Sequence, residues 1–290
     1  MSSISSRSRQ ADGIKKNLKM IHELQQTSNR VLAIDCPFPE AQAIIEGNNP
    51  GWLFVDDVNA PTVVLVWARG IEGFYLIGDT SNTEFFDGLD SFTEQVLKPR
   101  LHDLGITWLE ISGEENWNPI IEKVYRKRGL ESSQQWVYTL KPTMQEPMRQ
   151  FSGLGDSRVK RVDRQLLNGL SADNKKFLFS KLTKFWHSVD AFLDTGLGYA
   201  LVEGEEIVSL CFSGFVAGTI HVIDIETKVS HRRKGYAEVV AHAFIADCFE
   251  KQLQPYWDCM AENTASAQLA EKLGLTRSHV YTLYSIFLQK

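Results

Sequence analysis

Residues 221–237 read HVIDIETKVSHRRKGYA, a sequence that combines an alternating strand, a basic turn and the start of a helix. Strand alternation places His221 and Ile225 on one face, and Asp224 and Glu226 on the opposite face. The turn that follows is rich in basic side chains and contains one glycine: Lys228, His231, Arg232, Arg233, Lys234 and Gly235. Because backbone N–H groups and positive charge gather there at a helix N-terminus, the segment predicts a phosphate-binding site.

The composition is that of a globular chain. Its 290 residues are 43% hydrophobic and 23% charged, which predicts one large domain or two ordinary ones. A net charge of −5 argues against nucleic acid, including a tRNA substrate, and against an anionic membrane as partners. Four scattered cysteines form no CxxC pair, so we expect reduced thiols and no metal. The N-terminus lacks a secretory pattern and no window approaches ~18 apolar residues, so a cytoplasmic location is expected.

Hydrophobic periodicity predicts short strands and helices in two halves. We expect helices at 12–26, 40–46, 92–104, 119–127, 171–188, 236–251 and 264–273. Besides the strand within 221–229, we expect strands at 52–55, 62–68, 74–78, 108–111, 135–140, 199–203, 207–216, 255–260 and 280–288. Residues 142–155 hold two prolines and two glycines without periodicity, which predicts a linker between lobes at 1–141 and 156–290.

The two halves repeat one order of features. WLEISGEEN at 108–116 is followed by a predicted helix and RKRGL, and YWDCMAEN at 256–263 is followed by a predicted helix and EKLGL. This order favours a duplication. The first half reads GDTSNTEFFDG at 78–88, where the second half has its basic glycine turn. Only the second half therefore keeps the predicted phosphate-binding site.

Two motifs of the second half resemble the GNAT N-acetyltransferase superfamily. Arg232–Ala237 follows Arg-x-x-Gly-x-Ala, similar to the superfamily's acyl-CoA pyrophosphate loop, Arg/Gln-x-x-Gly-x-Gly/Ala, between a strand and a helix. ENTASAQLAEKLGL at 262–275 resembles its next motif, with Asn263 after a strand and Lys272 and Gly274 at the helix end. The wider sequence is similar to a subfamily of two-lobed bacterial acetyltransferases that includes the zwittermicin-resistance enzymes.

The resemblance implies a fold and an activity. The implied fold is α/β (α+β), with tandem GNAT-like lobes that each have a mixed, mostly antiparallel central sheet flanked by helices. The first lobe would be degenerate and the C-terminal lobe the complete acyl-CoA-binding one. The implied activity is N-acetylation of a primary amine of a small molecule, with acetyl-CoA as co-substrate, by direct attack on the thioester. An alternative function stays open, that of a non-catalytic acyl-CoA-binding or sensing protein. A homodimer stays open as the form in which the protein assembles.

The resemblance also assigns residues to the cofactor. The backbone of Ile225, Glu226 and Thr227 would pair with the pantetheine arm as an added strand would. The N–H groups of the loop would cradle the pyrophosphate, and the loop comprises Arg232, Arg233, Lys234, Gly235, Tyr236 and Ala237. Asn263 would form a hydrogen bond with the cofactor near its arm.

Amine acetylation needs a base, because an alkylammonium has a pKa of ~10. Family members often place this base on the strand before the loop, which points to His221, whose imidazole titrates near ~6.5. A histidine satisfied within the core is an equal alternative. Asp224 and Glu226 are the other candidates, and Glu226 is the second residue to which we assign a catalytic role.

The sequence departs from the family where many members carry a tyrosine that protonates the leaving thiolate, because position 270 is alanine. Water or a hydroxyl could substitute, and the candidates are Ser266, Tyr281 and Tyr284. Cys259 lies near the cofactor segment, but no base accompanies it, so direct transfer is expected rather than a covalent intermediate.

The acceptor pocket is expected to come from residues 183–199 and from the first lobe. That segment mixes aromatic and acidic groups suited to a cationic amine: Trp186, His187, Asp190, Phe192 and Asp194. Asp258 or Glu262 could hold such a substrate as well. An ordinary amphipathic helix with Phe185, Val189 and Phe192 turned inward explains the pattern equally well.

Overall fold

The computed structural model describes residues 21–24, 31–140 and 158–288. Contacts divide the chain into two compact units. The first unit holds the described residues up to Gly47, residues 51–133 and the chain from Tyr281 onward. The second unit holds Asn48–Pro50 and Gln134–Val280. No helix in the described ranges is long and apolar enough to cross a membrane.

The first unit is a sheet covered by helices. Its strands, in sheet order, are β1 (His22–Leu24), β2 (Gly51–Val55), β3 (Val63–Ala68), β4 (Gly73–Gly78), β5 (Trp108–Gly113) and the end of β12 (Thr276–Phe287). Neighbours are antiparallel except β4 and β5. The helical segments are α2 (Pro39–Ile45), α3 (Thr83–Phe92), the π-helix η1 (Thr93–Leu97), α4 (Lys98–Asp103), the short η2 (Glu115–Trp117) and α5 (Asn118–Tyr125). Aromatic side chains such as Trp67, Phe85 and Trp117 fill its core.

The second unit carries the segment from which the sequence analysis began. In sheet order its strands are β6 (Glu131–Thr139), β11 (Gln254–Met260), β10 (Ile220–Thr227), β9 (Glu206–Ala217), β8 (Gly198–Glu203) and β7 (Val159–Arg161). Only β10 and β11 run parallel. The helical segments are α6 (Arg164–Gly169), α7 (Ala172–Phe185), α8 (Val189–Thr195), the short η3 (Val229–His231), α9 (Tyr236–Glu250) and α10 (Thr264–Lys272). These mixed, mostly antiparallel sheets with flanking helices confirm the expected fold class.

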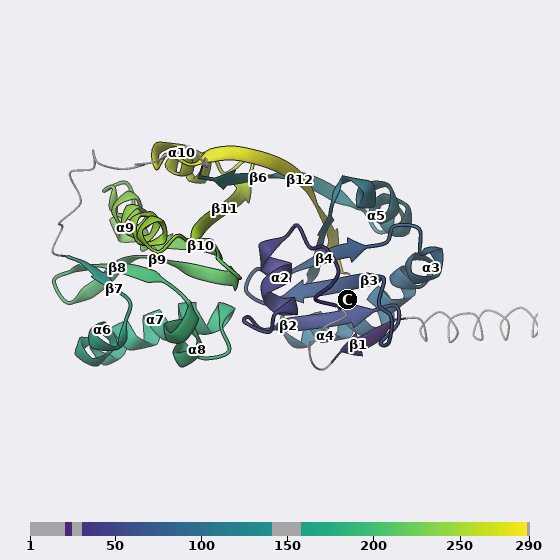
Figure 1. Cartoon of the computed structure of the whole chain (residues 1–290), viewed down its shortest axis with the longest axis horizontal. Helices are drawn as coiled ribbons and strands as arrows, with labels where there is room; N and C mark the ends of the chain where they lie inside the picture. Colours follow the sequence, from purple (N-terminus) through teal and green to yellow (C-terminus); the bar gives the residue numbers. More distant parts are fainter. Residues whose placement is uncertain (1–20, 25–30, 141–157, 289–290) are drawn as a thin grey trace, which may run out of the picture. The chain divides into compact units, whose positions relative to one another are not determined.

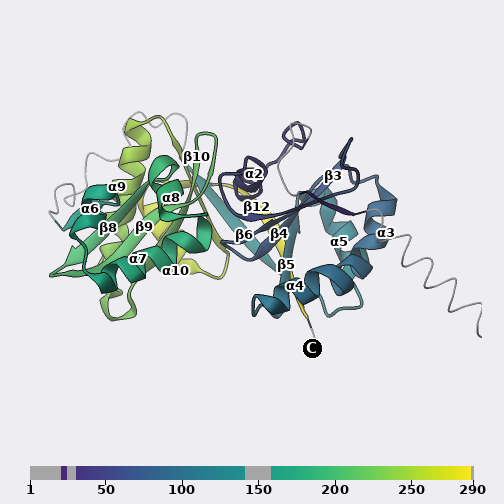
Figure 2. The same cartoon turned by 90° about the horizontal axis from the view of Figure 1, so that it is seen from below.

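The two faces of the second sheet pack against different helices. Figure 1 shows α9 on one face and α6, α7 and α8 on the other, and Figure 2 shows α7 and α8 from below. Ile223 and Ile225 join the core that α9 covers, whereas Glu226 pairs with Lys181 of α7. The predicted alternation along β10 is therefore confirmed.

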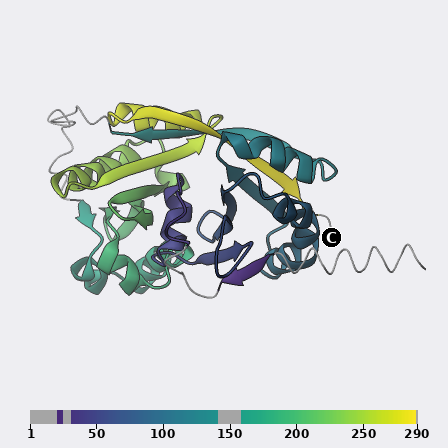
Figure 3. The same cartoon turned by 45° about the vertical axis from the view of Figure 1, so that its right-hand side comes forward.

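Each unit is completed by a strand from the other half of the chain. Residues 135–139 of β6 pair with β11 of the second unit. In return, Leu283–Phe287 of β12 pair with β5 of the first unit. Figure 3 shows the end of β12, in yellow, among the blue strands of the first unit. The compact units therefore differ from the predicted lobes 1–141 and 156–290 at these strands, because a strand's own sequence does not name its partner. The predicted linker 142–155 lies outside the described residues.

Three predicted helices differ from the observed elements. Of the predicted helix 12–26, residues 22–24 form a strand on β2, because Leu24 pairs there with Leu53, and most of the rest lies outside the described residues. The helix expected at 92–104 begins at Thr83, since the side chain of Asn82 caps it. The helix expected at 171–188 ends at Phe185, and Ser188 caps a separate α8.

Candidate active site

Strand β10 separates from β11 part-way along its length. The two strands pair only from Ile220 to Val222, although β10 continues to Thr227 and β11 to Met260. The pairing of β10 with β9 becomes irregular at the same point, between Val222 and Ile223, where β9 carries the extra residue Gly214. On the other side of β10, no described strand pairs with residues 223–227, so this edge can accept an extended ligand. The predicted pantetheine-binding residues lie on this part of β10.

The predicted phosphate-binding loop joins this strand directly to α9. The Nε of Arg232 donates to the carbonyl oxygen of Thr227 at 3.3 Å, which holds the loop to the strand end. Arg233 and Gly235 have left-handed backbone angles, with φ of 62° and 79°. Gly235 is the N-cap of α9 and provides no side-chain cap, and a Cβ there would meet no atom within 4 Å. An uncapped helix N-terminus behind such a loop is suited to an anion.

His221 lies in the paired part of β10 rather than in the part that leaves β11. It is 3% exposed, opposite Val216 on one side and Pro255 on the other. The Oγ of Ser213 accepts from the N–H of Leu197 at 3.0 Å and shares a hydrogen bond of 2.8 Å with the Nδ1 of His221. Burial lowers the pKa of His221 to about 4, with Lys251 adding to the effect and Asp247 opposing it, so the ring is neutral at pH 7.

This depressed pKa makes the stability of the protein depend on pH. Because the unfolded histidine has a higher pKa, near ~6.5, the unfolded state binds the proton first. We expect the contribution of His221 to the free energy of unfolding to be complete above pH ~6.5 and to fall by about 3 kcal/mol as the pH drops through 4. Urea unfolding at a series of pH values measures the loss. His221→Asn can keep a hydrogen bond with Ser213 but cannot titrate, so this loss should be missing from the pH dependence of the variant, and an unchanged dependence would contradict the assignment.

Asp224 and Glu226 lie on the face of the sheet that α7 covers. The Oε2 of Glu226 lies 2.5 Å from the Nζ of Lys181. Asp224 is half-buried, and its burial raises its pKa to about 6. Lys184 and Lys181 oppose this increase and Glu226 adds to it. Asp224 is thus a carboxyl that titrates near neutrality beside the separated part of β10.

Asn263 and the end of α10 have the geometry of the second motif. The Oδ1 of Asn263 caps α10 by accepting from the N–H of Ser266 at 3.2 Å. No described residue accepts from its Nδ2, which can therefore donate to a ligand. Gly274, with φ of 81°, ends the helix as predicted, and Lys272 pairs with Glu238 of α9 at 2.6 Å.

The position of the missing tyrosine is part of the core, since Ala270 is fully buried. Among the substitutes, the Oγ of Ser266 accepts from the Nε1 of Trp257 at 2.9 Å. Tyr281 and Tyr284 belong to the first unit, where Tyr284 donates to Glu122. Burial raises the pKa of Cys259, which keeps its thiol protonated and disfavours a covalent route.

The acceptor pocket expected from residues 183–199 is not assembled by its aromatic members. Trp186 is 1% exposed, and its Nε1 donates to the carbonyl oxygen of Ser213. The ring of the fully buried Phe192 packs edge-on against Trp186, with ring centroids 5.6 Å apart. Asp190 and Asp194 are exposed and pair with Arg164. His187 is exposed as well. The helical segments turn their aromatic side chains into the core, as the amphipathic alternative predicted.

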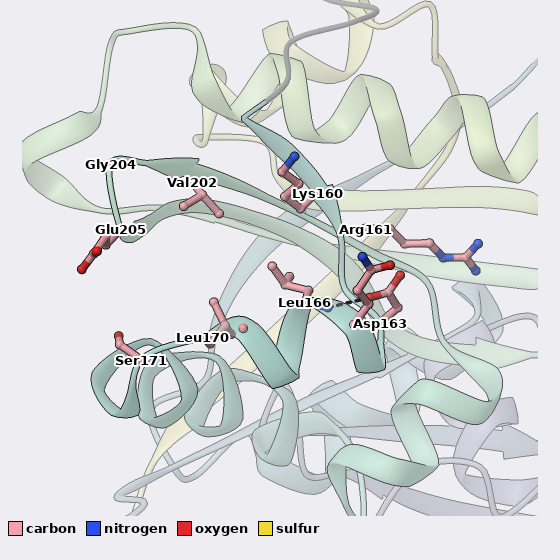
Figure 4. A pocket seen from close by; sticks show the side chains of 11 residues that line it. Lys160, Arg161, Asp163, Leu166, Leu170, Ser171, Val202, Gly204 and Glu205 are labelled. Carbon is pink, nitrogen blue, oxygen red and sulfur yellow. Dashed lines mark hydrogen bonds between the residues drawn. The ribbon is translucent and has the colours of Figure 1, made fainter.

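A cavity of about 720 Å³ lies elsewhere in the second unit, between α6, β7 and the β8–β9 turn. Leu166, Leu170 and Val202 face one another across it, while Arg161 points away (Figure 4). None of the predicted cofactor-binding residues lines it. In the described part of the chain, no three His, Cys, Asp or Glu side chains are arranged to hold a metal ion.

A comparison with models of protein families identifies the family to which this site belongs. The sequence model of the GNAT acetyltransferase family matches residues 39–284, which is most of the chain. The chain belongs to the GNAT acetyltransferase family. Membership of this family makes it an acyltransferase. The GNAT match also spans both units.

Individual GNAT proteins resemble the chain over most of its length. The "Uncharacterized N-acetyltransferase YdfB" of Bacillus subtilis is 28% identical over 244 residues, 83% of this chain and 88% of that protein. The crystal structure of a GCN5-related N-acetyltransferase-like protein from Streptococcus suis is 25% identical, with a TM-score of 0.62, and the match covers 89% of this chain and 96% of that one. A tandem GNAT protein from the clavulanic acid biosynthesis pathway has the same fold at 8% identity, with a TM-score of 0.53 and coverage of 86% and 88%.

Two features of this GNAT site were not found by sequence reasoning. The first is the place where β10 leaves β11, which puts His221 in the paired part of the strand, and the glycine inside β9 at position 214 was the available signal. The contacts of Glu203 with the loop join residues distant in sequence, and no local pattern indicates them.

Proposed function

We propose that the protein transfers an acetyl group from acetyl-CoA to a primary amine of a small molecule, by direct attack of the amine on the thioester. One observation carries this proposal: residues 223–227 of β10, whose outer edge no described strand pairs with, lead directly into the uncapped N-terminus of α9. An extended amide-containing arm fits the first, and a pyrophosphate fits the second. The reaction then takes place beside the separated part of β10.

The residues have separate roles in this proposal. The backbone of Ile225–Thr227 holds the pantetheine amides, and the N–H groups of Arg233–Ala237 hold the pyrophosphate. The Nδ2 of Asn263 donates to the arm of the cofactor. Acetyl-CoA supplies an activated acyl group, so the protein has to position the amine and remove its proton.

The geometry favours Asp224 over His221 as the base. The α9 face of β10 is filled by the core, so an acceptor would reach the thioester from the face that carries Asp224 and Glu226. A carboxylate with a pKa of about 6 accepts a proton at neutral pH, directly or through a water. Glu226 attracts the ammonium group of the acceptor, and solvent protonates the leaving thiolate.

Removing the carboxylate of Asp224 should slow the chemical step. We expect Asp224→Asn to lower kcat about a hundredfold or more while acetyl-CoA affinity is retained. Since the base must be unprotonated, the wild-type rate should rise as the pH passes through about 6 and then level off, and this rise should be absent from the variant. Stopped-time assays of thiol release between pH 5 and 9 measure both. If His221→Asn alone removed the rise, the base would be His221 instead.

Acceptor-dependent release of CoA thiol tests the function itself. The full chain is incubated with acetyl-CoA and a panel of small amines, from monoamines to polyamines and aminosugars, and acetylated product is identified by mass spectrometry. We expect thiol release to require an amine. Binding of acetyl-CoA without release for any amine would overturn the proposed transfer.

Several finer assignments belong to the same proposal. The resemblance of residues 221–275 supports the two-lobed bacterial subfamily that includes the zwittermicin-resistance acetyltransferases. The net charge of −5 supports a cytoplasmic enzyme that binds neither nucleic acid nor membrane. A homodimer is part of this proposal as well, and light scattering of the full chain tests it.

A further inference from the structure

The side chain of Asn49 lies at the irregular part of β9. Asn49 belongs to the segment Asn48–Pro50 between α2 and β2, which is part of the second unit, and it is 2% exposed. Its Nδ2 donates to the carbonyl oxygen of Gly214 at 2.9 Å and to that of Phe185 at 3.0 Å. Its Oδ1 accepts from the N–H of Val216 at 3.2 Å. One buried amide therefore makes three hydrogen bonds to the backbone, two of them to β9.

These backbone groups lie where β9 extends beyond its neighbour β8. The pairing of β8 with β9 reaches only to Phe212, and the extra residue Gly214 interrupts the pairing of β9 with β10. Buried backbone groups need hydrogen-bond partners, and Asn49 supplies them as a further strand would. Asn48 adds to this replacement, because its Nδ2 donates to the carbonyl oxygen of Val216 at 2.8 Å. The two asparagines therefore hold residues 214–216 in the shape of the bulge.

The backbone that Asn49 holds lies directly against Asp224. A Cβ at Gly214 would lie 3.5 Å from the Cβ of Asp224 and 3.1 Å from a ring carbon of Phe185. Phe185 is the last residue of α7, and its ring packs edge-on against Phe212, with ring centroids 5.5 Å apart. Phe212 is the residue that pairs with Asp224 across β9 and β10. Asn49 therefore ties together two elements that border Asp224, the end of α7 and the bulge of β9.

We infer that Asn49 is a positioning residue for the acetyl transfer, and that it acts on Asp224 through Gly214 and Phe185. The inference rests on the proposed function, because it requires Asp224 to take the proton of the acceptor amine. A base that moves by a fraction of an ångström transfers the proton more slowly, since the reacting atoms must be aligned. The N-terminal half of the chain thus supplies a residue that the reaction in the second unit needs.

Amine-dependent release of CoA thiol by Asn49→Ala tests the inference on the full chain. We expect kcat to fall about tenfold or more, while the KM for acetyl-CoA stays within about twofold of the wild-type value. Gly214→Ala disturbs the same place without removing a hydrogen bond of Asn49, because its Cβ crowds Phe185 and Asp224. It should slow the reaction in the same way.

The pH profile separates positioning from a loss of folded protein. Burial raises the pKa of the Asp224 carboxyl to about 6. The charged or titratable side chains that interact with it come from α7, β10 and β9, and they are Lys184, Lys181, Glu226 and Cys211. When Asn49 no longer holds the bulge to α7, water reaches the carboxyl, so its pKa falls and the rise in rate moves to lower pH. A smaller fraction of folded enzyme lowers the rate by one factor throughout and leaves the midpoint of the rise unchanged.

Asn174→Ala is the matched control. Asn174 is also buried, at 6% exposed, and its amide also bonds to the backbone, since it accepts from the N–H of Ile207 in β9 at 3.0 Å and donates to the carbonyl oxygen of Glu205. Both asparagine variants should lose a similar amount of thermal stability, but only Asn49→Ala should shift the pH profile.

The outcomes distinguish the positioning role from the proposed function. A wild-type midpoint in both Asn49→Ala and Gly214→Ala, or the same shift in Asn174→Ala, would overturn the positioning role and leave the proposed function standing. If the wild type released no thiol with any amine, the proposed function would be overturned, and the positioning role with it.

Discussion

Gly235→Glu is expected to abolish acetyl-CoA binding while the protein stays folded. The residue has φ of 79°, so a side chain there is strained by about 1–2 kcal/mol. A Cβ meets no atom within 4 Å, and a negative charge at the N-terminus of α9 stabilises the helix, so folding is preserved. The new carboxylate, however, competes with the pyrophosphate for the same N–H groups. Two like charges about 4 Å apart in this setting weaken binding at least about a hundredfold.

Gly218→Glu provides the control for this substitution. Gly218 lies between β9 and β10, also has positive φ, at 53°, and also has open space around the position of a Cβ. The two variants therefore share the added charge and the backbone strain. Calorimetry with acetyl-CoA should find wild-type affinity in Gly218→Glu and no measurable heat in Gly235→Glu. Equal affinities in both variants would remove the loop from the binding site.

A fragment of residues 156–290, the predicted C-terminal lobe, is expected not to fold. It lacks β6, which pairs with Tyr256–Met260 of β11 and contributes the fully buried Val137 and Tyr138. Loss of Tyr138 alone removes a large aromatic ring from the core beneath α9, at a cost of about 3–5 kcal/mol. Domains of this size have about 5–15 kcal/mol of stability in total, so the loss of the whole strand exceeds what the fragment can sustain.

Residues 131–290 form the comparison fragment because they retain β6. Asn49 donates to the carbonyl oxygens of Phe185 and Gly214 in the second unit, and both fragments lack it. A difference in stability between the two fragments therefore comes from the N-terminal extension that carries β6. Far-UV circular dichroism during heating should give a cooperative transition for the longer fragment only. A cooperative transition at the same temperature in both fragments would mean that β6 is dispensable.

The sequence was sufficient where local chemistry decides structure. Alternation along β10, the loop residues 232–237 and the stop at Gly274 depend on neighbours in the chain, and all three are found where predicted. Pairing across the sheet is different. The strand at 22–24 and the exchange of β6 and β12 are set by partners far away in sequence, which periodicity cannot identify.

The candidate site likewise has one part that local sequence predicts and another that depends on the folded structure. The position of the proposed phosphate-binding loop followed from its motif, because basic residues, a glycine and a helix start are adjacent in the chain. The two pKa shifts on which the proposed base depends did not follow from the sequence, since the pKa of His221 falls and that of Asp224 rises only through burial in the folded protein. Alternation correctly placed the two groups on opposite faces, but the part of β10 that leaves β11 becomes visible only in the structure.

The exchange of β6 and the end of β12 between the two halves also affects how the chain is synthesised and which deletions it tolerates. β5 leaves the ribosome long before Leu283–Phe287, which pair with it, so this edge of β5 stays open until those residues have been synthesised. A gene deletion that removes either half also removes a strand from the other. The first half, which has no counterpart of the basic loop at 232–237, therefore still supplies a strand to the sheet that carries this loop.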